Sequence, residues 1–148
     1  MKKKKYIFVL SLIMIILAIY TAVNMYISQG LLGDKVINKY VPETISKIRI
    51  VRISDNLEVI IKDKEQISTL IDSLSNLQVK DYKENIPPNN NDDETYYMWI
   101  YDDPNILLGI TIYNIGYISV FEFNDKTSNS ESYKVIKDLD KLNINKYL

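Results

Sequence analysis

The chain opens with four lysines, Lys2–Lys5, and continues with 22 residues, 6–27, that carry no charge. A helix of that length measures about 33 Å, close to the roughly 30 Å of a bilayer's hydrocarbon core. Only Ser11, Thr21 and Asn24 interrupt its apolar character, so it lacks the polar face of a helix packed on a soluble domain. The pattern predicts a transmembrane helix over residues 6–27.

The flanking charges predict the orientation of this helix. Positively charged flanks stay on the cytoplasmic side, and the first charges beyond the helix, Asp34 and Lys35, cancel. We therefore expect a cytoplasmic flank at residues 1–5 and an extracytoplasmic domain after the helix. The alternative is a signal cleaved after Ala22, although Tyr20 occupies a position where signal peptidase sites need a small residue.

Residues 28–42 contain two of the four glycines and end in proline, which predicts a stalk between the membrane and a domain at 43–148. The domain begins with two β-branched segments that flank the turn residues Ser54–Asn56, and this pattern predicts a β-hairpin. A helix follows, with Asp63 as its N-cap. Its apolar stripe has i, i+3, i+4, i+7 spacing: Ile67, Leu70, Ile71 and Leu74.

Beyond the helix the pattern predicts a short strand near residues 77–82 and a polar loop at 83–94. Three strands then follow within 95–123, separated by turns so short that neighbouring strands must be antiparallel. A last strand and a short C-terminal helix close the chain. The expected fold is α+β: an antiparallel sheet in the order ββαβ-ββββ-α, with one main packed helix.

Composition excludes several kinds of chemistry. The sequence has no cysteine and no histidine, which removes thiol catalysis, disulfides, thiolate or imidazole metal sites and the usual catalytic triads. Residues 31–148 carry fourteen basic and nineteen acidic residues, a net charge of −5 that disfavours nucleic-acid binding. No catalytic motif is present, so we expect no enzyme, no catalytic residues and no cofactor.

An acidic run, Asp92–Glu94, supplies oxygen ligands of the kind that calcium accepts. It lacks the alternating ligands and the glycine of a calcium-binding loop, so we expect a solvated loop and no metal site. Binding of a cation by this loop stays open.

The candidate interaction surface is a row of aromatic residues. Strand alternation places Tyr97, Trp99 and Tyr101 on one face and leaves the opposite face for the core. Exposed aromatic rows mark interaction surfaces, whereas cross-strand aromatic pairs can also serve only to stabilise a sheet. Both interpretations remain open from the sequence.

The segment "ISKIRIVRISDNLEVIIKDKEQISTLIDSLSNLQVKDY", followed by the "YMWIYDD…GITIYNIGYISV…YKV" meander, resembles a class of small bacterial surface proteins. These come from low-GC Gram-positive bacteria and join one N-terminal membrane anchor to a domain of unknown function. The resemblance covers residues 45–142 and implies no catalytic residues.

These patterns together predict a single-pass protein of the cell membrane whose domain is a non-enzymatic protein-interaction module. Its partners would be the membrane, through residues 6–27, and an extracytoplasmic protein. Two alternatives remain: a ligand-binding or sensory domain for cell-wall glycan or a small molecule, and a secreted inhibitor released by signal cleavage.

Overall fold

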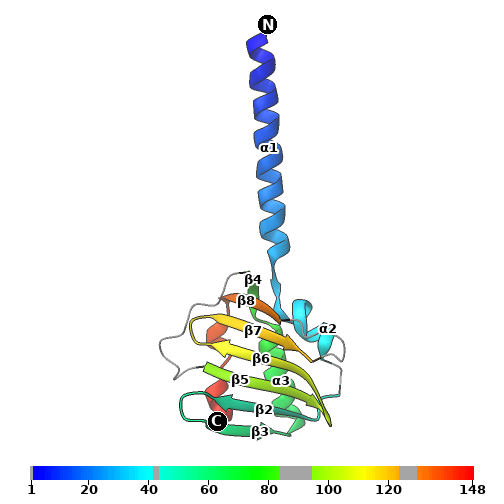
Figure 1. Ribbon diagram of the computed structural model, residues 1–148, viewed down its shortest axis with the longest axis vertical. Coiled ribbons are helices and arrows are strands. Elements are labelled where there is room, and N and C mark those ends of the chain that lie inside the picture. The colour runs from blue at the N-terminus through cyan, green and yellow to red at the C-terminus, as the bar shows by residue number, and fades with distance from the viewer. Residues whose placement is uncertain (1, 42–43, 84–94, 124–129) are drawn as a thin grey trace.

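The computed structural model describes residues 2–41, 44–83, 95–123 and 130–148. The side chains at positions 2–5, 8–9, 24–27 and 141 also lie outside this description. One long helix, α1 (Lys2–Ser28), stands on a domain made of a sheet with helices and turns on one side (Figure 1).

The domain is built on one eight-stranded sheet in which all neighbouring strands are antiparallel. The strand order across the sheet is β1-β4-β8-β7-β6-β5-β2-β3. The strands are β1 (Gln29–Leu31), β2 (Lys47–Arg52), β3 (Glu58–Ile61), β4 (Gln78–Asp81), β5 (Thr95–Asp102), β6 (Asn105–Tyr113), β7 (Tyr117–Glu122) and β8 (Ser130–Lys137). This arrangement confirms the predicted α+β class with an antiparallel sheet.

The local pairings follow the sequence pattern. The segments on either side of Ser54–Asn56 form the predicted β2–β3 hairpin, and β5, β6 and β7 pair in sequence order. In β2, Ile48 and Ile50 are fully buried, while the opposite face is half-buried. The second face of β2 is therefore only partly shielded, and no bulge interrupts the pairing of β2 with β3 or β5.

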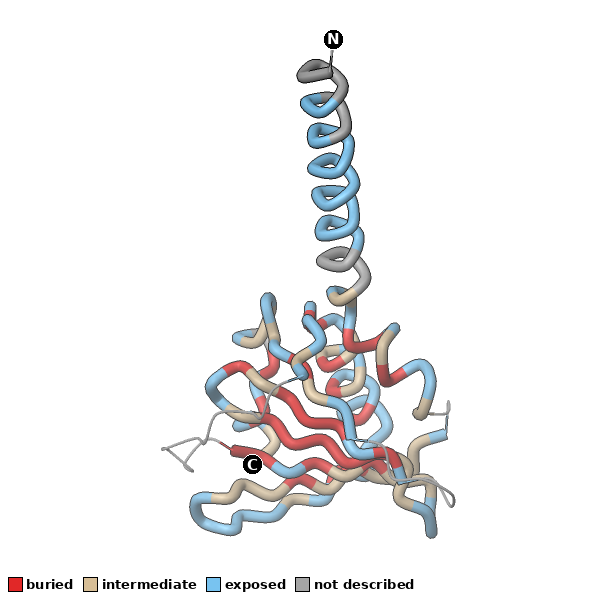
Figure 2. The backbone as a smooth tube through the Cα atoms, turned by 45° about the horizontal axis from the view of Figure 1, so that its top comes forward, coloured by how far each residue is buried: buried red, intermediate tan, exposed pale blue. Residues whose placement is uncertain are grey.

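The helix α3 (Lys64–Ser75) covers one face of the sheet. Its N-cap is Asp63, whose Oδ1 accepts a hydrogen bond of 2.9 Å from the backbone N–H of Gln66. Three residues of the predicted stripe, Ile67, Leu70 and Leu74, are buried against the sheet. The central strands supply the other half of this core, and Figure 2 shows their buried runs in red.

The C-terminal segment closes the same side of the sheet. In place of the expected α-helix it forms two 3₁₀ turns, η3 (Leu139–Lys141) and η4 (Ile144–Tyr147). Asp138, which precedes them, has a left-handed backbone with a φ of 68°. Leu142 and Ile144 pack into the core, so the segment still buries apolar side chains as predicted for a helix.

Residues 29–41 belong to the domain, in contrast to the predicted stalk. They form β1, a π-helical turn η1 (Gly33–Ile37) and a short turn α2 (Asn38–Tyr40). Leu32 and Val36 are fully buried, and the Leu32 N–H donates to the backbone oxygen of Leu77 at 2.9 Å. The stalk expectation rested on glycine content, but one of those glycines serves close packing.

Gly33 allows η1 to lie directly on the end of α3. A Cβ at Gly33 would come within 3.0 Å of the Ser75 backbone oxygen, so a larger residue would force the two elements apart. Farther along, Tyr40 is tied to β7: its hydrogen bond with the Glu122 carboxylate raises the pKa of Tyr40 to about 12. Both contacts fix residues 29–41 to the sheet and its helix.

The helix α1 extends away from the domain and is continuous with β1 at its base (Figure 1). Its described large apolar side chains between Tyr6 and Val23 are 48–75% exposed, so nothing in the domain packs on them. Within the described residues, no helix has both the length and the apolar character required to cross a membrane. The predicted span 6–27 includes side chains, at 8–9 and 24–27, that lie outside the described set.

The packing of residues 29–41 can be tested with two neighbouring leucines. Leu32→Ala should lower the free energy of unfolding by about 2–5 kcal/mol, because it leaves a cavity in the core. Leu31→Ala, at a residue 36% exposed, should cost about 1 kcal/mol or less. The measurement is urea unfolding of the full chain in detergent, followed by the fluorescence of Trp99, the only tryptophan. Equally small effects of the two substitutions would show that this segment is a stalk.

Candidate functional site

The site lies on the face of the sheet opposite α3, where three central strands carry aromatic side chains. In register, Trp99 of β5 lies beside Gly109 of β6, which lies beside Phe121 of β7. The next row along the strands joins Tyr97 to Thr111. Because alternate residues of a strand share a face, the core residues between them point to the other side.

Gly109 lies in the middle of this face, and the absence of a side chain there lets the Phe123 ring lie close to its backbone. With no side chain there, Trp99 and Phe121 border an open groove of about 300 Å³, which we call the aromatic groove. Its lining on this face is formed by Tyr97, Trp99, Gly109, Thr111, Tyr113, Phe121 and Phe123. Glycine inside a strand often marks a close approach, and here a Cβ at Gly109 would lie only 3.0 Å from Cε2 of Phe123.

The aromatic groove is exposed to solvent and mostly apolar. The exposed fractions of Tyr97, Phe121 and Phe123 are 40%, 43% and 52%. The rings of Tyr97 and Trp99 meet edge to face, with centroids 5.8 Å apart and an interplanar angle of 64°. Such an exposed cluster of large rings on a sheet is a feature of surfaces that bind a partner.

A fixed positive charge borders the aromatic groove. The Arg49 guanidinium carbon lies 4.9 Å from the centroid of the Trp99 ring, which is a cation–π geometry. Arg49 donates two hydrogen bonds, of 2.8 and 2.7 Å, to the two carboxylate oxygens of Glu58. These bonds lower the pKa of Glu58 and raise the pKa of Arg49. The pair therefore stays ionised and holds the guanidinium against the tryptophan.

Of the three predicted surface residues, the structure brings Tyr97 and Trp99 into the aromatic groove and leaves Tyr101 outside its lining. Tyr101 is half-buried, and the Lys47 Nζ lies 4.8 Å from its ring centroid. Lys47 also pairs with Asp103 at 2.6 Å, and hydrogen bonding from Lys47 lowers the pKa of Asp103. Tyr101 thus belongs to a salt-bridged margin of the sheet.

The residues that β6 and β7 contribute to the groove were not predicted from the sequence. Phe121 and Phe123 alternate with Val120 and Glu122, so their shared face was present in the pattern. Gly109 stands alone between apolar residues in a strand, which is a recognised sign of a close approach. Neither signal reveals that these residues lie beside Trp99, because that depends on the register between strands.

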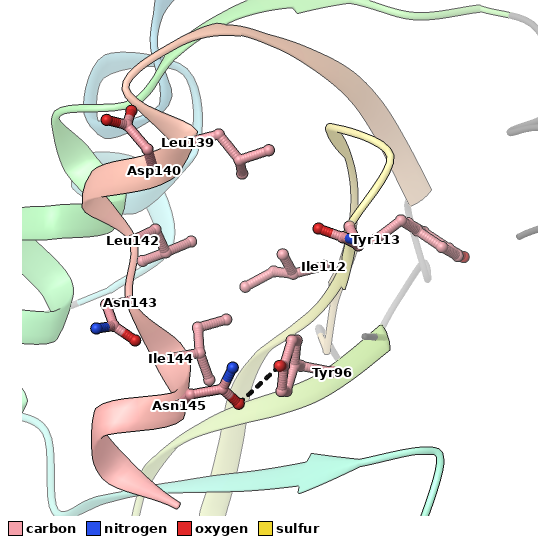
Figure 3. Close-up of a pocket in the computed structure, with 10 residues that line it drawn as sticks. Tyr96, Ile112, Tyr113, Leu139, Asp140, Leu142, Asn143, Ile144 and Asn145 are labelled. Carbon is pink, nitrogen blue, oxygen red and sulfur yellow. Dashed lines mark hydrogen bonds between the residues drawn. The ribbon is translucent and has the colours of Figure 1, made fainter. Parts of the chain in front are cut away.

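A second cavity, of about 230 Å³, separates the C-terminal turns from the end of β5 and β6 (Figure 3). The Tyr96 hydroxyl donates a 2.8 Å hydrogen bond to Oδ1 of Asn145 across it. The lining includes core residues such as Ile112, Leu142 and Ile144. Asp140 is the only acidic residue in the described lining. The cavity is a gap in the packing that one hydrogen bond bridges. Its described lining does not indicate a catalytic or metal-binding site.

The sequence also predicts a solvated acidic loop and no metal site. The acidic run Asp92–Glu94 lies outside the described residues. Within the part of the chain that the structure describes, no cluster of three or more acidic residues could hold a metal ion.

The chain was compared with known proteins at three levels. No protein-family model, no curated protein and no solved structure matches it.

The role of Gly109 in keeping the aromatic groove open can be tested by filling it. Gly109→Val should change the free energy of unfolding by less than about 1 kcal/mol, because valine suits a strand and the exposed end of the Phe123 ring can move aside. Acrylamide should then quench Trp99 fluorescence less efficiently, since the new side chain covers the ring. Gly30→Val, the same substitution in β1 outside the groove, is the control and should leave quenching unchanged. Equal quenching in Gly109→Val and the wild type would contradict an open groove.

Proposed function

We propose that this chain is a single-pass membrane protein whose extracytoplasmic domain binds another protein through the aromatic groove, without enzymatic activity. The observation that carries the proposal is the cluster of the exposed Tyr97, Phe121 and Phe123 with the half-buried Trp99 around Gly109. Aromatic side chains dominate the energetics of protein interfaces, and a hollow at their centre accepts an anchor side chain from the partner.

The volume and lining of the groove favour a protein segment over a whole small ligand. About 300 Å³ is at the lower limit of ligand pockets and suits one or two apolar side chains. The partner would present a large apolar or aromatic residue to Trp99 and Phe121, with a carboxylate or carbonyl near Arg49. Binding of a cell-wall glycan is the alternative, supported by the exposed ring of Tyr97 beside the half-buried ring of Trp99.

The membrane anchor is the second part of the proposal. Residues 6–27 are uncharged in sequence, and the described apolar side chains of α1 are exposed along its length. Such a surface is costly in water, and a bilayer is a solvent that would cover it. Lys2–Lys5 favour retention of the N-terminus in the cytoplasm, which places the domain outside.

Binding can be tested with a random peptide library displayed on phage and the full chain held in lipid nanodiscs. Selected peptides should share a large apolar anchor residue, and their binding should shift the emission of Trp99. Gly109→Val should weaken binding by about tenfold or more, which corresponds to roughly 1.4 kcal/mol. Gly30→Val, the same substitution in β1 outside the groove, is the matched control and should bind as the wild type does.

The same titration with an oligomer of β-1,4-linked N-acetylglucosamine tests the glycan alternative. A shift of Trp99 emission with the sugar, and none with selected peptides, would favour the alternative. Peptides that bind the wild type and Gly109→Val equally well would contradict recognition by the aromatic groove.

The anchor and its orientation can be tested by cysteine labelling, because the chain contains no cysteine. In whole bacterial cells that express the full chain, a membrane-impermeant maleimide should label Ser54→Cys, which lies in the exposed β2–β3 turn. Lys3→Cys should be labelled only after lysis, and it should remain on the mature protein. Loss of Lys3→Cys from the mature chain would instead indicate a cleaved signal, and recovery in the soluble fraction would contradict the anchor.

A further inference from the structure

The end of the domain nearest α1 has a charge opposite to that of the domain as a whole. Three segments lie at the base of α1 (Figure 1): residues 29–41, β4 with the two residues after it, and β8. These segments carry three acidic residues and six lysines. The six form what we call the basic strip: Lys35, Lys39, Lys80, Lys83, Lys134 and Lys137. Residues 31–148 as a whole have a net charge of −5, so the excess of lysines is local.

Internal contacts account for only part of the basic strip: Lys35 pairs with Asp81, and the Lys134 Nζ lies 5.7 Å from the centroid of the Tyr117 ring. Lys80 and Lys134 lie directly opposite each other on neighbouring strands, and both are exposed. Like charges at opposed positions destabilise a sheet. An external anion near the two ammonium groups would remove that penalty.

Two of the three carboxylates of this region are engaged by other groups, and the third, Asp34, accepts only a 3.5 Å hydrogen bond from the Asn38 amide. Asp81 accepts a hydrogen bond from Lys35 at 2.7 Å, and Glu131 accepts one from the Tyr133 hydroxyl. Among the described residues, the structure contains no ion pair for Lys39, Lys80 or Lys83. Much of the positive charge of the basic strip is therefore available to an outside partner.

A cleft of about 560 Å³ lies within the same region. Its charged lining consists of three lysines, Lys35, Lys39 and Lys83, and two carboxylates, Asp81 and Glu131, and the hydroxyl-bearing residues Ser130 and Ser132 also line it. Ammonium groups and hydroxyls are the donors that phosphate oxygens accept. Strand alternation places Lys80 and Lys134 on the face of the sheet opposite Asp81 and Tyr133 of the cleft, so donors for phosphate oxygens lie on both faces of the sheet edge at the base of α1.

We propose that the basic strip binds the headgroups of anionic phospholipids and holds the domain against the bilayer at the base of α1. This inference depends on the proposed membrane anchor, which would place these lysines next to the lipid surface. Lysines near an anionic membrane are attracted to it individually and add their effects. The aromatic groove, in the central strands, would then have a restricted orientation relative to the membrane.

The experiment uses the full chain in nanodiscs of neutral phosphatidylcholine or of phosphatidylcholine with phosphatidylglycerol. A nitroxide is attached to Gln78→Cys, an exposed position in β4, or to Ser54→Cys at the far end of the sheet. In anionic discs, a water-soluble relaxation agent should reach the Gln78→Cys label about threefold less than in neutral discs, because the label is drawn to the lipid surface. The Ser54→Cys label should not respond to the lipid.

The double variant Lys80→Gln/Lys134→Gln should lose this protection, and so should the wild type in about 1 M salt, where the Debye length falls to about 3 Å. The control variant Lys62→Gln/Lys64→Gln removes the same amount of charge at positions outside the basic strip. With this variant, the Gln78→Cys label should still be protected in anionic discs. Equal accessibility of the Gln78→Cys label in both lipids would overturn the inference and leave the anchor intact. A full chain that does not insert into either disc would overturn the anchor, and the inference with it.

Discussion

The structure depends on the burial of one face of an eight-stranded sheet by elements that come from three parts of the chain. The chain leaves the sheet at β3, one edge, crosses it as α3 and re-enters at β4 near the other edge. Ile67, Leu70 and Leu74 meet the central strands along this path, and every one of them is buried. Without α3, the apolar face formed by Ile48, Ile50 and their neighbours would lie in water, which costs about 25 cal/mol for each Å².

The other face of the sheet is not covered by these elements. Its side chains therefore do not have to fit a packed core, and they can form the aromatic groove. Large rings remain partly exposed on β5 and β7, while Gly109 lowers the floor between them. The Arg49–Glu58 pair fixes one border through bidentate hydrogen bonds. A rigid sheet with a second, unneeded apolar surface is a natural platform for a binding site, because its shape is set by the buried face.

Charge is distributed along the sheet according to the same geometry. The edge that leads into α1 is rich in lysine, and the central strands β5 to β7 carry only acidic charges. Residues 29–41 provide part of this basic edge while Leu32 and Val36 bury their side chains in the core. The first segment after α1 therefore has two roles in the domain, since it completes the core and sets the charge of the surface beneath the helix.

The sequence by itself determined the elements whose signals are local: the β2–β3 hairpin around Ser54–Asn56, the α3 stripe with its Asp63 cap, and the alternation that put Tyr97 and Trp99 on one face. It failed where a residue's role depends on distant partners. Gly33 is typical of a flexible stalk in the sequence, but in the structure it packs against Ser75. Phe121 and Trp99 border the same groove because both are paired with Gly109 on the strand between them. Periodicity records which side chains share a face, whereas strand order and register decide which faces meet. Only the tertiary structure fixes those, because they come from burying the whole sheet at once.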